Sequence, residues 1–262
     1  MSKIFDLTGK VAFVTGAASG LGFAMAEAFA EQGALVVFAD VDAPGLERAV
    51  GRLTQAGLKA EGVQLDVREA QRIRETIEST AAKHGRLDIV VANAGVTGGP
   101  PFADPEGQIE NVDLATWENV IKINQTGVFA TMQAAARVMK PQRSGRIIVT
   151  CSISGLRTGV ISGYTYSATK AAVVRLVHIA AVELAPFNIM VNGIAPGPFL
   201  TNIAGGRLHR EPERVEMMAN SVPMKRVADP QEIKGLALLL ASEGSSYLTG
   251  TVIPIDGGAT AM

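Results

Sequence analysis

The sequence predicts an α/β fold: one domain over residues 1–262, built as a doubly wound, seven-stranded parallel sheet with helices on both faces. Two observations support this prediction. Seven short apolar, β-branched runs alternate with longer amphipathic stretches, as strands and helices do in a parallel sheet that is covered on both sides. No linker-like stretch interrupts the alternation, and 47% of the residues are hydrophobic, which is ample for one core.

The expected elements follow one another along the chain. The apolar runs predict strands at residues 11–15, 35–39, 62–65, 87–92, 146–150, 189–194 and 251–255. The amphipathic stretches predict helices at residues 23–32, 43–55, 72–83, 114–139, 166–184 and 230–240. Because crossovers between parallel strands are right-handed, this order of elements winds the sheet in both directions from its centre.

Two segments do not fit the alternation. Residues 97–111 are rich in Gly and Pro, and residues 199–226 contain Gly205-Gly206, scattered charges and Met217-Met218. In doubly wound sheets, ligands bind beyond the carboxyl ends of the strands, where such loops emerge. Both segments are therefore candidates for substrate contact, with residues 199–226 as a substrate lid, although each could be an ordinary surface loop.

Composition excludes several classes of function. The formal net charge of -1 supplies no positive field for nucleic acid or an anionic membrane. The single Cys151 forms no internal disulfide or cysteine-based zinc site, and the three histidines lack ligand spacing, so no metal is expected. The N-terminus does not read as a secretory signal, and no apolar run is long enough to span a bilayer. We therefore expect a cytoplasmic protein.

A glycine-rich loop joins the first expected strand to the first expected helix. Its residues Gly16, Gly20 and Gly22 allow a sharp turn and a close approach of the backbone to a ligand. The helix that follows offers free N–H groups and the positive end of its dipole, which suit a pyrophosphate. The spacing is Gly-x-x-x-Gly-x-Gly rather than Gly-x-Gly-x-x-Gly, but its position predicts a Rossmann-type dinucleotide site.

Asp40 stands at the end of the second expected strand. A carboxylate there can accept hydrogen bonds from the adenosine ribose hydroxyls and would repel a 2′-phosphate. Its sequence neighbours Ala39, Val41 and Asp42 include no basic residue. The cofactor is therefore expected to be NAD rather than NADP. Asp40 could instead cap the following helix, but Asp42 is better placed for that role.

Two of the three tyrosines, Tyr164 and Tyr166, lie just ahead of Lys170. Residues four apart share one face of a helix, so Tyr166 and Lys170 lie together, one turn apart. Tyr164 and Lys170 are six apart, which places them on different sides. If one tyrosine works with this lysine, it is Tyr166. Tyr164 is expected just before the helix, where its ring could form a wall of the same cavity.

These residues are part of an ordered set of motifs that resembles the short-chain dehydrogenase/reductase family and covers nearly the whole chain. The set consists of Thr15-Gly16-x-x-x-Gly20-x-Gly22, Asp66-Val67, Asn93-Ala94-Gly95, Asn124, Ser152, Tyr166-x-x-x-Lys170, Pro196-Gly197 with Thr201, and Asp256-Gly257-Gly258. One departure is Ala92, where family members often have Asn. The resemblance implies an oxidoreductase that transfers a hydride between a nicotinamide cofactor and a secondary alcohol or its ketone.

The resemblance also implies roles for four catalytic residues. Tyr166 would be the acid/base, Ser152 would hydrogen-bond the substrate oxygen, and Asn124 would hold a water that links Lys170 to solvent. Lys170 would fix the cofactor ribose, and its ammonium together with the oxidised nicotinamide should lower the pKa of Tyr166 toward working pH. Ser154 is the alternative to Ser152, because the stretch to Tyr166 is one residue longer than is common.

The remaining implied contacts are with the cofactor, the substrate and other subunits. The cofactor residues would be Gly16, Ser19, Gly20, Leu21, Gly22, Asp40, Asp66, Val67, Asn93, Ala94, Gly95, Tyr166, Lys170, Pro196, Gly197, Phe199 and Thr201. The substrate would meet Ser152, Ser154, Tyr164, Tyr166 and Phe199, with Ile153, Val160 and Leu200 also in the lining. The resemblance implies a homotetramer in which residues 114–139 and 166–184 form one interface.

Three readings of function stay open. The first is an NAD-dependent dehydrogenase acting on a small-molecule alcohol or ketone. The second is an NADPH-dependent ketone or 3-ketoacyl reductase, against which Asp40 argues. The third is a dinucleotide-binding protein without catalysis, which would have no physical need for Asn124, Ser152, Tyr166 and Lys170 together. Arg157, Arg207 and Arg210 could bind an anionic substrate group or simply be solvated.

Overall fold

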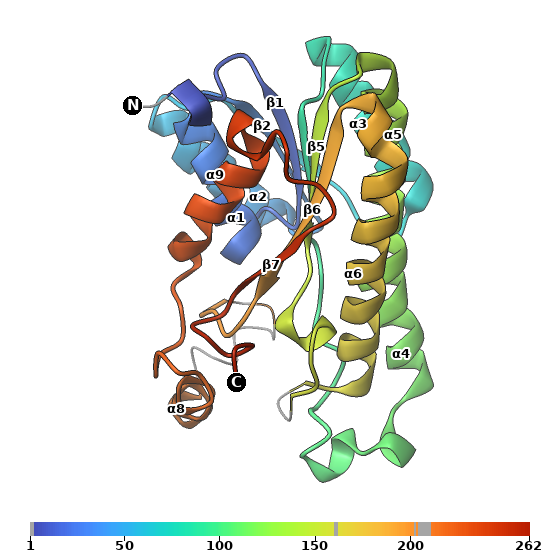
Figure 1. The fold of residues 1–262 in the computed structure, drawn as a ribbon, viewed down its shortest axis with the longest axis vertical. Coiled ribbons are helices and arrows are strands. Elements are labelled where there is room, and N and C mark those ends of the chain that lie inside the picture. Colours follow the sequence, from blue (N-terminus) through green and yellow to red (C-terminus); the bar gives the residue numbers. More distant parts are fainter. Residues whose placement is uncertain (1–2, 160–161, 202, 204–210) are drawn as a thin grey trace.

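The structure is a computed structural model that describes residues 3–159, 162–201, 203 and 211–262 (Figure 1). Its centre is a parallel sheet of seven strands in the order β3-β2-β1-β4-β5-β6-β7, which confirms the predicted fold. The strands are β1 (Val11–Thr15), β2 (Leu35–Asp40), β3 (Ala60–Gln64), β4 (Ile89–Ala92), β5 (Gly145–Thr150), β6 (Ile189–Pro196) and β7 (Val252–Ile255). The order reverses between β1 and β4, and in doubly wound sheets ligands bind at the carboxyl edge beside such a reversal.

Helices cover both faces of the sheet (Figure 1). One face carries α1 (Gly20–Glu31), α2 (Ala43–Gln55) and α9 (Lys234–Ala241). The other carries α3 (Ala70–His84), α4 (Leu114–Ile121), α5 (Val128–Gln142) and α6 (Tyr164–Leu184). A further helix, α8 (Pro212–Asn220), lies beyond the carboxyl edge, at the bottom of the view. Short 3₁₀ turns are η1 (Lys3–Phe5), η2 (Pro105–Gly107), η3 (Ile109–Asn111), η5 (Ile153–Gly155), η6 (Ala185–Phe187), η7 (Pro230–Ile233) and η8 (Glu243–Ser245).

The core has two layers, one on each side of the sheet. Successive side chains of a strand point to opposite faces, so Phe13 packs under the helices of the α3–α5–α6 side. Ala12 and Val14 pack under α1 and α9 on the other side. Both layers need apolar residues, which is why the central strands are fully buried and mostly apolar. The edge strand β3 (Ala60–Gln64) is partly exposed and correspondingly more polar.

Several element boundaries differ from those predicted. The first helix begins at Gly20 instead of residue 23, because the end of the glycine loop is itself helical. The predicted helix 114–139 is interrupted by a π-helical turn, η4 (Lys122–Gly127), and it runs on to Gln142. Helix α6 begins at Tyr164. The prediction that Tyr164 precedes this helix is therefore wrong, because Gly163 is the residue that caps it.

The two irregular segments lie near the carboxyl edge. Residues 97–111 form η2 and η3 and pack against the start of α6, where the Phe102 and Tyr164 rings are 6.2 Å apart. Residues 199–226 contain α8 and a bridge from Phe199 to Ala228. The predictions that involve Val160, Gly205-Gly206, Arg207 and Arg210 fall outside the described residues.

Candidate active site

The start of α1 is built to receive a phosphate group. Ser19, its N-cap residue, has an extended backbone, and its side chain makes no capping hydrogen bond. The first N–H groups of the helix therefore have no side-chain partner there and carry the positive end of the helix dipole. At Gly20, where φ is +58°, an added Cβ would meet only Thr201, at 3.6 Å. Thr201 thus lies beside the glycine loop at the start of α1, where the free N–H groups suit an anion.

Gly22 lets the first turn of α1 lie directly on the glycine loop. A Cβ at this position would stand 2.1 Å from the carbonyl oxygen of Gly16, far inside van der Waals contact. Gly16 has φ +66°, and its own Cβ would stand 2.8 Å from the Cα of Ala94. The glycines predicted from the sequence are thus required by close backbone packing between β1, α1 and the end of β4.

A buried hydrogen-bond network joins three strand ends under this loop. The side-chain amide of Asn93 donates to the carbonyl oxygens of Thr15 (3.0 Å) and Gly16 (3.1 Å). Its oxygen accepts from the Thr150 hydroxyl at 3.0 Å. The Thr15 hydroxyl in turn accepts from the N–H groups of Asn93 and Ala94, at 3.0 and 3.1 Å. Asn93 thus holds the ends of β1, β4 and β5 together. Its side-chain amide uses both N–H groups and accepts one hydrogen bond, although position 92 carries Ala where family members often have Asn.

Sequence reasoning did not single out Thr15 or Thr150 as site residues. Each is the last residue of its strand, and the carboxyl ends of parallel strands meet at one edge of the sheet. A hydroxyl residue at that position in two strands was the signal that could have identified them. Ala18 was missed as well, because only its main-chain N–H takes part, as a donor to Asp40.

Asp40 is held at the end of β2 by two main-chain groups. One carboxylate oxygen accepts from the N–H of Ala18 at 3.0 Å and the other from the N–H of Asp42 at 3.1 Å. Asp42 caps α2 by accepting from the N–H of Gly45 at 3.1 Å, as the sequence predicted. The Asp40 carboxylate is therefore fixed beside the glycine loop, partly exposed, with lone pairs left for ribose hydroxyls.

Asp66 and Val67, after β3, were predicted to contact the adenine, and both already have contacts within the protein. Both oxygens of Asp66 accept hydrogen bonds from the Arg68 side chain, which holds the pKa of that carboxyl below its ordinary value. The carbonyl of Val67 lies against Gly127 of the π-helical turn, where a Cβ would come within 2.7 Å. An adenine at this position would share the Asp66 carboxylate with Arg68.

The predicted residues after β6 fall into two groups. Pro196 and Gly197 lie at the end of the strand, and the N–H of Gly197 donates to Ile255 at 3.0 Å. Thr201 faces the glycine loop at Gly20, as described above. The ring of Phe199 is 5% exposed and packs in the core beneath α1 and α9, as Leu21 also does in part. The structure therefore does not place the Phe199 ring on the substrate side.

Tyr166, Ser152 and Lys170 meet at the end of β5 and on the first turns of α6. Lys170 is 2% exposed, and its ammonium donates to the carbonyl oxygen of Thr150 at 2.7 Å. Its nitrogen lies 5.7 Å from the centre of the Tyr166 ring, one helical turn away as predicted. The Ser152 side chain lies close enough to the Tyr166 phenol to act on its pKa. The Ser152 hydroxyl also accepts from the N–H of Ser154 at 3.1 Å.

Burial controls the protonation of this pair. It raises the pKa of Tyr166 above its ordinary value of 10, against the opposing effect of the Ser152 side chain. It lowers the pKa of Lys170 to about 8. The expectation that Lys170 lowers the pKa of Tyr166 is thus not met in the protein alone, because burial dominates the shift and the Lys170 ammonium hydrogen-bonds the Thr150 carbonyl. The positive charge of an oxidised nicotinamide would act in the other direction.

Asn124 lies in the π-helical turn and is fully buried. Its side chain accepts from the N–H of Val96 at 2.9 Å and donates to the carbonyl of Val96 at 2.8 Å. It therefore fastens the helix to the chain that follows β4. A relay water at Asn124 would have to use its main-chain carbonyl. Gly95 lies between Asn124 and Lys170, since a Cβ there would be 3.3 Å from the amide oxygen and 3.7 Å from the lysine nitrogen.

Ser154 and Tyr164, which were predicted to contact the substrate, lie between Ser152 and Tyr166 in the sequence. Ser154 is partly buried and belongs to η5, the turn that begins directly after Ser152. Tyr164 is 40% exposed and touches Phe102 from the segment 97–111. The same segment packs on the start of α6, where a Cβ at Gly163 would meet the carbonyl of Pro100 at 2.7 Å. The Gly- and Pro-rich segment thus supports the helix that carries Tyr166.

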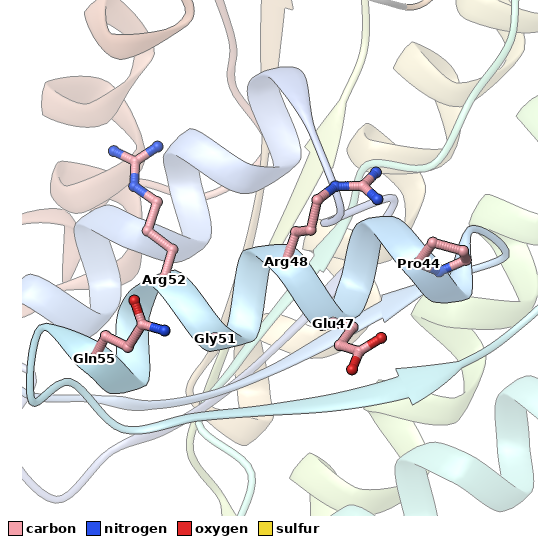
Figure 2. Close-up of a pocket in the computed structure, with 6 residues that line it drawn as sticks. All are labelled: Pro44, Glu47, Arg48, Gly51, Arg52 and Gln55. Carbon is pink, nitrogen blue, oxygen red and sulfur yellow. The ribbon is translucent and has the colours of Figure 1, made fainter.

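A shallow groove along the outer face of α2 is a separate feature (Figure 2). Six residues of that one helix line it, and Arg48 and Arg52 extend from the same side of it. Arg52 is engaged with Glu27 at 2.9 Å and with the Phe23 ring, whereas Arg48 lies 3.9 Å from Asp42. Arg48 therefore places a positive charge near the end of β2. The residues next to Asp40 in the sequence include no such charge.

Two features were also searched for among the described residues. Over those ranges, no group of three or more His, Cys, Asp or Glu side chains could hold a metal ion. Within the same part of the chain, no helix combines the length and the apolar character that crossing a membrane requires.

Comparison with known proteins agrees with this site. A family model described as enoyl-(acyl carrier protein) reductase matches residues 16–260. Over 254 residues, the chain is 39% identical to cis-4-hydroxycyclohexanecarboxylate dehydrogenase of Sinomonas cyclohexanicum, covering 97% of both chains. It is 35% identical over 260 residues to 5-keto-D-gluconate 5-reductase of Escherichia coli K12, covering 98% of both.

Solved structures give the same result. A short-chain type dehydrogenase/reductase from Mycobacterium marinum superposes with a TM-score of 0.91 at 36% sequence identity, and 99% of each chain is covered. Sequence and structure thus agree over essentially the full length of the chain. The chain belongs to the short-chain dehydrogenase/reductase family, whose members are oxidoreductases that bind a nicotinamide dinucleotide.

Proposed function

We propose that the protein is an NAD-dependent oxidoreductase that interconverts a secondary alcohol and its ketone by hydride transfer, with Tyr166 as the acid/base. The observation that carries this proposal is the position of Tyr166 one helical turn from a buried Lys170, whose nitrogen lies 5.7 Å from the centre of the Tyr166 ring, with the buried Ser152 at the end of β5 beside them. A protein that only bound a dinucleotide would have no use for a desolvated phenol and a desolvated ammonium at one site, since each charge is costly to bury.

The side chains divide the proton chemistry between them. The Ser152 hydroxyl accepts from the N–H of Ser154, which fixes its position, and it would donate its proton to the substrate oxygen and stabilise developing charge there. In alcohol oxidation Tyr166 takes the hydroxyl proton from the substrate, and in ketone reduction it returns one. Lys170 keeps a positive charge beside the phenolate. The bound cofactor supplies the hydride chemistry, accepting or donating the hydride.

The residues present fit NAD better than NADP. Asp40 is anchored by two main-chain N–H groups beside the glycine loop, so its charge cannot swing away from a 2′-phosphate. The alternative, an NADPH-dependent ketone or 3-ketoacyl reductase, is favoured on the chain itself by Arg48, which is exposed and already near Asp42. Cofactor choice is therefore assigned to Asp40.

The substrate is proposed to be a small hydroxylated or carbonyl compound. The names of the relatives, a hydroxycyclohexanecarboxylate dehydrogenase and a keto-gluconate reductase, support this class. The substrate would enter between η5, the start of α6 and the predicted lid. Because Ser152 and Tyr166 meet the reacting oxygen there, Ser154 and Tyr164 would contact the rest of the molecule.

We also propose a cytoplasmic homotetramer. Large apolar side chains are exposed on the two helices of the predicted interface: Phe129 (48%) on α5, and Ile179 (53%) and Val182 (80%) on α6. Such side chains on neighbouring helices support association with another copy. Light scattering coupled to gel filtration measures the assembly, and a monomer in wild type would refute this part. The lone Cys151 is buried, in keeping with a reducing compartment.

The test is a kinetic screen of wild-type protein against secondary alcohols, sugars and their ketones, with NAD(H) and NADP(H). Turnover is followed by the absorbance of the reduced nicotinamide. We expect substrate-dependent turnover with kcat/KM at least about tenfold higher for NAD(H), equivalent to ~1.4 kcal/mol. Tight NADH binding without turnover of any compound would favour the non-catalytic reading, and equal efficiencies would refute the role of Asp40.

A further inference from the structure

A second pair of hydroxyl groups lies beside the catalytic serine. The side-chain oxygens of Ser154 and Ser162 are 2.6 Å apart. Ser154 belongs to η5, and Ser162 comes from the segment that leads into α6, two residues before Tyr164. The beginning and the end of the connection between β5 and α6 therefore bring these hydroxyls together.

The hydrogen-bonding capacity of this pair is not used up. A contact between two hydroxyls consumes one proton and one lone pair, so one proton and several lone pairs remain. Among the described residues, neither side-chain oxygen has another hydrogen-bond partner. Both serines are partly buried rather than enclosed, so a ligand can reach them. The pair can therefore both donate to and accept from a polar group of a substrate.

The position of the pair relative to the reacting oxygen follows from chain geometry. The N–H of Ser154 donates to the Ser152 hydroxyl over 3.1 Å. A serine hydroxyl lies at most about 3.7 Å from its own main-chain nitrogen, so the Ser154 hydroxyl is within about 7 Å of the Ser152 hydroxyl. That reach suits a substrate whose reacting oxygen binds Ser152 while an oxygen on a neighbouring carbon binds the pair.

We propose that Ser154 and Ser162 form a binding site for a second oxygen of the substrate, which makes the enzyme selective for vicinal diols and hydroxyketones over simple alcohols. The inference rests on the proposed function, because it names the substrate class of the same site. A simple alcohol would leave the second hydroxyl proton without a partner in the closed complex, and such a mismatch lowers kcat/KM.

The test compares trans-1,2-cyclohexanediol with cyclohexanol, using NAD, in wild type and in the variants Ser154→Ala and Ser162→Ala. We expect wild type to prefer the diol in kcat/KM, and each variant to lower the diol-to-cyclohexanol ratio by about five- to tenfold. Ser162→Thr keeps a hydroxyl and should keep most of the ratio. Ser79→Ala, on the exposed side of α3, is the matched control and should leave the ratio unchanged.

A purely structural role predicts a different result. If the contact only ties the two segments together, the variants lower the melting temperature and reduce kcat/KM for both alcohols equally, so an unchanged ratio overturns the proposal. If wild type turns over neither alcohol, the proposed function is judged by the wider screen, and calorimetric titration of the enzyme–NADH complex decides on the hydroxyl site. Tighter binding of the diol that is lost in Ser162→Ala supports the hydroxyl site, and equal binding overturns it.

Discussion

Replacing Lys170 by methionine should make the protein more stable at neutral pH while abolishing its activity. Lys170 is 2% exposed, and its ammonium has one neutral partner, the Thr150 carbonyl at 2.7 Å. No carboxylate of the described residues forms an ion pair with it. Methionine has a similar length and fills the space without a charge, so the variant removes the desolvation cost and keeps most of the packing.

The size of the effect follows from the pKa. Burial lowers the pKa of Lys170 from 10.5 to about 8, and each pKa unit corresponds to ~1.4 kcal/mol, so the charge costs ~3 kcal/mol at pH 7. The Thr150 carbonyl loses its partner, which returns about 1–2 kcal/mol of that. Lys170→Met should therefore raise the free energy of unfolding by about 1–2 kcal/mol.

The dependence on pH gives the sign of the effect independently. Below pH 8 both the folded and the unfolded lysine are protonated, so the cost is present in full. Between pH 8 and 10.5 the unfolded chain binds more protons than the folded protein, and wild-type stability should rise relative to the variant. Urea unfolding followed by circular dichroism, at pH 7, 9 and 10, measures this difference.

The control is Lys59→Met, an exposed lysine whose replacement should leave both the stability and its pH dependence nearly unchanged. If Lys170→Met is less stable than wild type at pH 7, and the two proteins have parallel stability curves up to pH 10, the ammonium is not under strain in the folded protein. The reasoning from burial would then be refuted.

Two further predictions concern the cofactor site. Asp40→Asn removes the charge that faces a 2′-phosphate, with Arg48 nearby, so the ratio of kcat/KM for NAD to that for NADP should fall at least about tenfold; an unchanged ratio would show that another group selects the cofactor. Gly22→Ala forces a Cβ to within 2.1 Å of the Gly16 carbonyl, so it should weaken NADH binding in fluorescence titrations and lower the urea midpoint. The same change at Gly51, where an added Cβ would meet no atom within 4 Å, should raise the free energy of unfolding by about 0.5–1 kcal/mol. Equal effects at both glycines would contradict the packing account.

The sheet was predictable because its strands are short apolar runs at helix-length intervals. The local sequence pattern predicted the structure less well wherever contacts with another segment of the chain decide it. The start of α6 is one example, since Gly163 packs on the Pro100 carbonyl and Gly98 on Tyr166, and this contact comes from the segment 97–111. The π-helical turn at residues 122–127 is another, because the Asn124 side chain is tied to Val96 across the sheet edge.

The candidate site was predictable where spacing along one element places the residues, as with Tyr166 and Lys170, which lie one helical turn apart. It was not predictable where the role depends on what lies opposite. Thr15 and Thr150 became part of the site only when their strands met Asn93 at the same edge. The pKa of Tyr166 depends on burial, which no spacing of residues reveals. The burial of Phe199 in the core was not predictable either, because an apolar residue after a strand can turn to the core or to a ligand.

The comparison of Tyr166→Phe with Tyr164→Phe tests the central claim most directly. Both variants remove one phenolic hydroxyl and keep the ring, and NAD-dependent turnover and NADH binding are measured for each. The account predicts that Tyr166→Phe loses nearly all turnover and still binds NADH, while Tyr164→Phe alters KM or substrate preference and keeps most of kcat. Near-complete loss in both variants, or substantial kcat in Tyr166→Phe, would contradict the assignment of Tyr166 as the acid/base.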